Sequence, residues 1–102
     1  MEETLFKFDK RLGIPIPNLQ YHWEDYETNM QQHILMKWES IRGMIPDRIK
    51  YLETMINEKQ EKLNNEEDFE ECCRLNEQIG EIASVINDLW ILYRIDQQVT
   101  TA

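Results

Sequence analysis

The chain has 102 residues, of which 41% are hydrophobic and 30% are charged, and its formal net charge is −9 at pH 7. A chain of this length forms one domain with one modest core, and its apolar content argues against intrinsic disorder. Residues 1–50 carry 7 basic and 8 acidic side chains, whereas residues 51–102 carry 4 and 12. Because lysine and arginine supply the attraction to phosphates, this balance disfavours direct binding to nucleic acid.

Residues 1–17 are expected to form an N-terminal arm that lies against the rest of the protein. Three apolar residues of this arm follow a helical step, whereas the alternation Phe-Lys-Phe at positions 6–8 is equally consistent with a short strand. The stretch Ile14–Pro17 should be extended, because each proline drives the preceding residue out of the helical region.

The remainder, residues 18–102, is predicted to be a single helical bundle domain. Apolar residues at helical spacing predict helices at about 19–42, 46–64 and 68–99. Short connections make consecutive helices antiparallel neighbours. The expected fold is therefore all-α, an antiparallel three-helix bundle with a long projecting C-terminal helix.

The helix boundaries rest on capping and breaking residues. Asn18 is the expected N-cap of the first helix, and Asp68 the expected N-cap of the third. Gly43 is expected to end the first helix, with Pro46 in the first turn of the second.

The C-terminal helix carries a second apolar stripe, on the side opposite to its core-facing stripe. This second stripe is a predicted interaction surface, formed by Val85, Ile91, Leu92, Ile95 and Val99. The end of the helix overruns its hairpin partner and would expose an apolar patch. We therefore expect a homodimer, or docking onto a helical protein partner. The alternative is that the helices are offset differently, or that residues 1–17 fold over this end.

Residues 56–82 resemble the UVR motif, which is found in the B and C subunits of the bacterial excinuclease and in some regulators of bacterial stress proteases. The resemblance rests on a polar linker, the triplet Asp68-Phe69-Glu70 and a following Leu75 and Ile79. Cys72 and Cys73 stand where that family has two alanines. The resemblance implies a helical hairpin used for protein–protein association.

Within the predicted hairpin, three apolar residues are expected to hold the two helices together. Phe69 lies just inside the third helix and is expected to pack back onto Ile56 and Leu63, which pins the hairpin.

No residue pattern indicates a catalytic, metal or cofactor site. His22 and His33 would lie about 16 Å apart along one helix, too far to share a metal ion. Cys72 and Cys73 are adjacent, which disfavours a disulfide between them, and they should be reduced thiols.

The start of the chain lacks the basic region and apolar core of a signal peptide, and no apolar run is long enough to span a membrane. A cytoplasmic location without membrane contact is expected. The function expected is a small acidic protein–protein interaction module without catalysis that self-associates through its C-terminal helix. The alternative is an acidic inhibitor that occupies a basic, nucleic-acid-binding surface of a partner.

Overall fold

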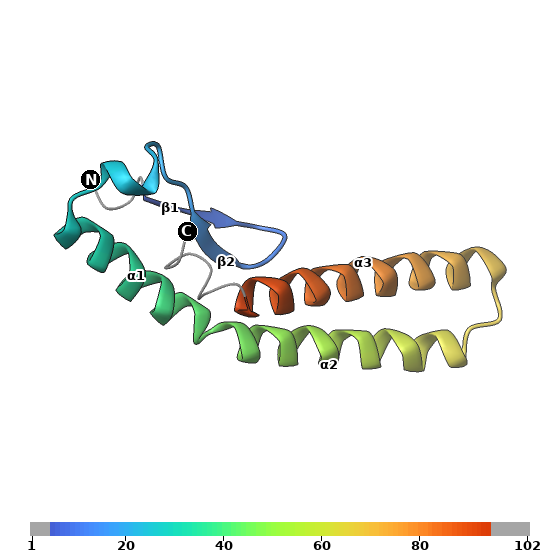
Figure 1. Cartoon of the computed structure of the whole chain (residues 1–102). Helices are drawn as coiled ribbons and strands as arrows, with labels where there is room; N and C mark the ends of the chain where they lie inside the picture. The colour runs from blue at the N-terminus through green and yellow to red at the C-terminus, as the bar shows by residue number, and fades with distance from the viewer. Residues whose placement is uncertain (1–4, 95–102) are drawn as a thin grey trace.

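The structure, a computed structural model, describes residues 5–94. Its elements are the strands β1 (Phe6–Asp9) and β2 (Ile14–Pro17), the short 3-10 helix η2 (Trp23–Asp25), and the helices α1 (Thr28–Arg42), α2 (Ile45–Asn64) and α3 (Phe69–Arg94). α3 folds back antiparallel to α2, whereas α1 and α2 follow one another with a bend (Figure 1). The molecule is a rod of 59 × 20 × 20 Å, with the strands near one end and the α2–α3 turn at the other.

The prediction of an antiparallel three-helix bundle is wrong, because the chain does not reverse between α1 and α2. A helix that ends in a reversal commonly has a glycine in the left-handed conformation after its last turn. Gly43 instead has φ −64° and ψ −18°, and Met44 has φ −84° and ψ −15°, so both stay in the right-handed helical region. α1 and α2 together form one long bent helix.

The bend has an identifiable cause in Pro46. Backbone bonds continue up to the junction and across it, since the N–H of Gly43 donates to Glu39 (3.1 Å), that of Met44 to Ile41 (2.9 Å) and that of Arg48 to Met44 (3.1 Å). Pro46 has no N–H to offer the carbonyl four residues earlier, that of Arg42, and its ring crowds that position. The sequence signals at Gly43 and Pro46 therefore mark a kink and not a helical hairpin.

The first helix also begins later than predicted, at Thr28 instead of residue 19. The hydroxyl oxygen of Tyr26 accepts the backbone N–H groups of Gln20 (3.2 Å) and Tyr21 (3.4 Å), which closes residues 20–26 into a loop that contains η2. Asn18 does not cap a helix; its N–H donates to the carbonyl of Leu5 (2.8 Å) and extends the strand pairing.

The N-terminal arm is a β-hairpin. β1 and β2 pair antiparallel, with Phe6 opposite Pro17 and Asp9 opposite Ile14. The extended conformation predicted for Ile14–Pro17 is confirmed, and of the two alternatives for positions 6–8 the strand is correct. The connecting turn needs Gly13, whose φ is +80° and whose N–H donates to the carbonyl of Asp9 (2.7 Å).

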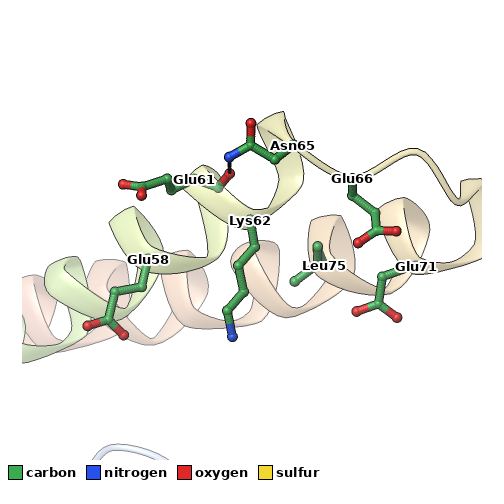
Figure 2. Close-up of a pocket in the computed structure, with 7 residues that line it drawn as sticks. All are labelled: Glu58, Glu61, Lys62, Asn65, Glu66, Glu71 and Leu75. Carbon is green, nitrogen blue, oxygen red and sulfur yellow. Dashed lines mark hydrogen bonds between the residues drawn. The ribbon is translucent and has the colours of Figure 1, made fainter.

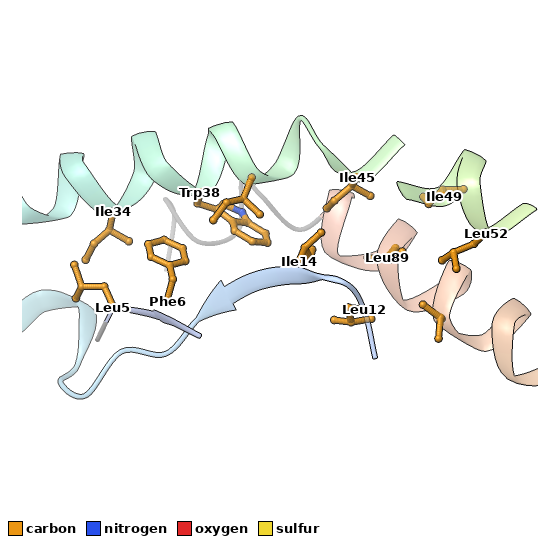
Figure 3. Packing of buried hydrophobic residues seen from close by; sticks show 12 residues of the cluster. Leu5, Phe6, Leu12, Ile14, Ile34, Trp38, Ile45, Ile49, Leu52 and Leu89 are labelled. Atoms are coloured by element: carbon orange, nitrogen blue, oxygen red, sulfur yellow. The ribbon is translucent and has the colours of Figure 1, made fainter. Parts of the chain in front are cut away.

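This hairpin, and not a third antiparallel helix, completes the hydrophobic core. The close-up shows Leu5, Phe6 and Ile14 on the side of the strands that faces α1 (Figure 3). One cluster joins the hairpin, α1, the first half of α2 and the C-terminal third of α3, through Leu5, Phe6, Leu12, Ile14, Ile34, Trp38, Ile41, Ile45, Ile49, Leu52, Val85 and Leu89.

The turn of the β-hairpin is held between α2 and α3. Arg48 donates through Nε to the carbonyl of Leu12 (3.0 Å). Arg11 pairs through Nη1 with Asp88 (2.8 Å) and donates through Nη2 to the hydroxyl of Ser84 (2.9 Å). The N-terminal arm therefore folds over the C-terminal part of α3, which is the alternative that the sequence left open.

The distal part of the α2–α3 hairpin has a thinner core. Apolar residues spaced by three and four continue along both helices, but within the described residues Leu75 is the one buried side chain beyond the main cluster. A polar pair interrupts the seam, because Lys59 donates through Nζ to Oε1 of Gln78 (2.9 Å). A polar residue in an apolar seam specifies the register of the two helices at a cost in stability.

Substitution by alanine should have opposite effects on stability at two of the glycines. A Cβ at position 13 would lie 2.4 Å from Nε of Arg48, in a left-handed backbone that disfavours side chains. We expect Gly13→Ala to lower the free energy of unfolding by about 1–3 kcal/mol. Gly80 is helical and a Cβ there meets nothing within 4 Å, so Gly80→Ala should raise stability by about 1 kcal/mol. Urea denaturation of both variants measures the difference, and equal effects would contradict this assignment of the turn.

Candidate interaction surfaces

The interaction surface predicted on the C-terminal helix is only partly exposed. Val85 is buried, with 8% of its surface exposed, and Leu92 is half-buried against the same core. Ile91 is 45% exposed. Ile95 and Val99 lie outside the described residues. Val85 is therefore a core residue of the same chain and is not available to a partner.

The β-hairpin turn contacts α3 on both sides of Val85. Ser84 and Asp88 flank Val85 on α3 and both contact the side chain of Arg11. The turn thus lies beside Val85, which is four residues from the buried Leu89 and therefore shares the core-facing side of α3. The apolar pattern of residues 1–17 indicated that this arm packs against the rest of the protein. It did not indicate which helices the arm contacts.

A smaller aromatic cluster remains at the C-terminal end of α3. The rings of Trp90 and Tyr93 meet edge to face, with centroids 5.7 Å apart. The guanidinium of Arg42, from the end of α1, lies 4.8 Å from the centroid of the Tyr93 ring. Trp90 is exposed within this cluster, and its neighbour Ile91 is also exposed. These contacts tie the bend between α1 and α2 to the last turns of α3.

The opposite end of the rod is the tip of the α2–α3 hairpin, where the structure contradicts the predicted role of Phe69. Ile56 and Leu63 are half-buried, but Phe69 is 78% exposed and does not pin the hairpin. Leu75 is the buried residue at this end. At 100° per residue Leu75 lies about 120° around α3 from Phe69, so the two side chains cannot both face α2.

The tip is ordered by hydrogen bonds around the first turn of α3. Asp68 accepts the N–H of Glu71 on its carboxylate (3.1 Å), so the predicted N-cap is confirmed. The N–H of Asp68 in turn donates to the carboxylate of Glu66 (3.2 Å). The Cys72 thiol donates to the carbonyl of Glu66 (3.6 Å). Phe69 is thus held outward on a well-connected turn.

A shallow hollow of about 520 Å³ lies beside this turn (Figure 2). Its lining combines four carboxylates with one lysine, one amide and one apolar side chain: Glu58, Glu61, Lys62, Asn65, Glu66, Glu71 and Leu75. Within residues 5–94, no three histidine, cysteine or acidic side chains are placed to hold a metal ion. The hollow therefore presents negative charge around a small apolar floor.

The two cysteines have different surroundings. Cys72 is half-buried and Cys73 is exposed, and both are free thiols. Burial raises the pKa of the Cys72 thiol, and the negative charges of Glu66, Asp68 and Glu71 and the neighbouring Cys73 raise it further. A raised pKa leaves less reactive thiolate at neutral pH.

The chain matches no family model, no curated protein and no solved structure. The resemblance of residues 56–82 to the UVR motif stays a prediction. Across the part of the chain that the structure describes, no helix is long and apolar enough to cross a membrane.

Phe69 is the residue at this site whose role the sequence reasoning mistook. The signal that would have placed it correctly was the confirmed cap itself: if Asp68 caps α3, Phe69 is its first residue, and side chains there point back past the helix end. The contact of Arg42 with Tyr93 had no signal in the sequence, because it depends on the bend.

The thiols should differ in their rate of alkylation. We expect iodoacetamide at neutral pH to modify Cys73 well before Cys72 in the folded protein, because Cys73 is exposed while the pKa of Cys72 is raised. Raising the pH should bring the two rates closer. Peptide mass spectrometry after timed quenching gives both rates, and the unfolded protein provides the reference in which the difference should shrink. Faster reaction at Cys72 would contradict the burial and charge described at this turn.

Proposed function

We propose that the protein is a protein–protein interaction module that binds a partner through the tip of its α2–α3 hairpin. The observation that carries this proposal is the position of Phe69. Among the large hydrophobic side chains of the described residues it has the greatest exposed fraction, 78%. A large ring held in water on an ordered turn is a typical anchor of an interface, because aromatic residues dominate binding energy at interface centres.

The charge around Phe69 indicates the kind of partner. Positions 58–77 contain 8 acidic and 3 basic residues, a local charge of −5 out of −9 for the chain. Two of the three basic side chains are already engaged within the hairpin, Lys59 with Gln78 and Arg74 with Glu71. A partner with an apolar pocket rimmed by lysine or arginine is complementary to this tip in both shape and charge.

The alternative of an acidic inhibitor is a special case of the same proposal. If the basic surface of the partner normally binds nucleic acid, the acidic tip would compete with the phosphates. In either case the proposed role involves no catalysis and no cofactor, and its proposed location is the cytoplasm.

The tip is tested by comparing two exposed apolar residues at opposite ends of the rod. Met36, on α1, is 73% exposed and lies far from the tip, so it is matched to Phe69 in exposure. The native chain, immobilised, should retain binding proteins from an extract of its own source cells. We expect the Phe69→Ala variant to bind these proteins more weakly, whereas the Met36→Ala variant should bind them as the native chain does. The losses should be about 10–100-fold in affinity for a central aromatic anchor. Retained proteins should dissociate as salt is raised.

If the native chain and Phe69→Ala retain the same proteins to the same extent, the hairpin tip is not the binding surface. A Phe69→Leu variant is a useful second control, because it keeps an apolar group without the ring. Circular dichroism should show unchanged helix content in all three variants, since neither Phe69 nor Met36 is buried.

Self-association through the end of α3 stays a second proposal, supported by the exposure of Trp90 and Ile91 side by side. Light scattering after size exclusion tests it with Ile91→Glu. If α3 is the interface, the native chain should be a dimer and Ile91→Glu a folded monomer, because a buried unpaired carboxylate would oppose association. A variant that keeps the native mass would place any dimer contact elsewhere.

A further inference from the structure

The two edges of the small sheet differ in their capacity to bind another strand. Leu5 and Asn18 form the next pair of the β1–β2 ladder, beyond Phe6 and Pro17. This is a hydrogen-bonded pair, because the N–H of Asn18 donates to the carbonyl of Leu5 (2.8 Å). Bonded and non-bonded pairs alternate in an antiparallel ladder. Lys7 and Asp9 of β1 therefore bond across to β2, whereas Phe6 and Phe8 direct their N–H and C=O groups outward.

The outer edge of β2 is blocked by proline. By the same alternation, the outward positions of β2 are those of Pro15 and Pro17, neither of which has an N–H. Proline at such positions is a recognised protection of sheet edges. α1 moreover packs against β2 (Figure 1).

The outer edge of β1 has no such protection. Among residues 5–94, no hydrogen bond reaches the outward N–H groups of Phe6 or Phe8. The side chain of Phe8 is 60% exposed on this strand. An unpaired edge beside an exposed aromatic ring is the arrangement to which an additional strand binds.

We propose that the edge of β1 pairs antiparallel with the same edge of a second copy of this chain, which goes beyond the proposed tip interaction. The charges on β1 support this occupant. When Phe8 lies opposite Phe8 of the other copy, the outward N–H and C=O groups of the two residues bond reciprocally, and Lys7 of each copy faces Asp9 of the other. The strand is thus complementary to itself in charge around a two-fold axis.

This contact is short, and the dimer should be correspondingly weak. A few edge residues bury far less than the area of a stable interface, so we expect a dissociation constant of about 100 μM or weaker. Sedimentation velocity between about 10 μM and about 1 mM covers this range.

Phe8→Pro is the decisive variant. It removes the outward N–H without removing a bond inside the hairpin, so it should abolish the dimer while leaving the monomer folded. Phe8→Ala keeps the N–H and should still dimerise, though more weakly because the ring is lost. Circular dichroism and thermal unfolding report whether Phe8→Pro has kept its fold.

A charge reversal tests the register and does not depend on that variant folding. Lys7 is exposed and makes no ion pair within the described residues. Lys7→Glu places two carboxylates opposite each other at both ends of the contact, and we expect the dimer to weaken about tenfold at low salt. Lys37→Glu on α1 makes the same change of charge away from the edge and should leave the dimer unaffected.

Three results would overturn the proposal: a native chain that stays monomeric throughout the concentration range, a folded Phe8→Pro variant that dimerises as the native chain does, or equal weakening by Lys7→Glu and Lys37→Glu. A dimer lost in Ile91→Glu but kept in folded Phe8→Pro would assign self-association to α3 instead.

Discussion

The helical conformation of Gly43 and Met44 is the constraint on which the rest of the architecture depends. A left-handed glycine at this junction would have turned α1 back along α2 and α3, and three helices would have shared one core. Because both residues stay right-handed, the helix bends at Pro46 and continues, so α1 diverges from α3. The apolar side of α1 and the last turns of α3 then need another cover. The N-terminal β-hairpin supplies it.

The result is a protein with two unequal halves. In the half that contains the strands, both strands and all three α-helices contribute side chains to the core. The distal half consists of α2 and α3 alone, and within the described residues its one buried side chain is Leu75. Local unfolding needs least free energy where few apolar contacts must be broken. The tip that carries Phe69 is therefore expected to open more readily than the strand-bearing half, despite its hydrogen-bonded turn. Such a gradient suits a segment that adapts to a partner.

Much of the local structure could be predicted from the sequence, because local rules decide it. The helical spacing of apolar residues places α2 and α3, the cap at Asp68 fixes where α3 begins, and the prolines make Ile14–Pro17 extended. The arrangement of these elements could not be predicted in the same way. Gly43 followed by Pro46 is compatible with both a reversal and a kink, and the choice depends on what else can cover α1. The position of the β-hairpin against α3 involves the Arg11 contacts, which join residues more than seventy positions apart.

The candidate site at the hairpin tip was likewise predictable in part from the sequence. Phe69 and the acidic residues around it are evident in the sequence, but the exposure of Phe69 follows from the direction of one side chain at a helix start. Helical periodicity alone groups Phe69 with the core-facing residues of α3, since it does not distinguish the first turn from the interior. The aromatic cluster of Trp90 and Tyr93 likewise owes its contact with Arg42 to the bend.

The prolines of β2 also limit how large any assembly built on the sheet can become. A strand that pairs with β1 extends the sheet on one side only, because Pro15 and Pro17 leave the other side without donors. If the added strand is a second β1, its own β2 closes the far side in the same way. Growth by strand addition then terminates at two chains. A sequence with an open aromatic edge, which would otherwise be at risk of forming fibrils, is in this way restricted to a finite, closed complex.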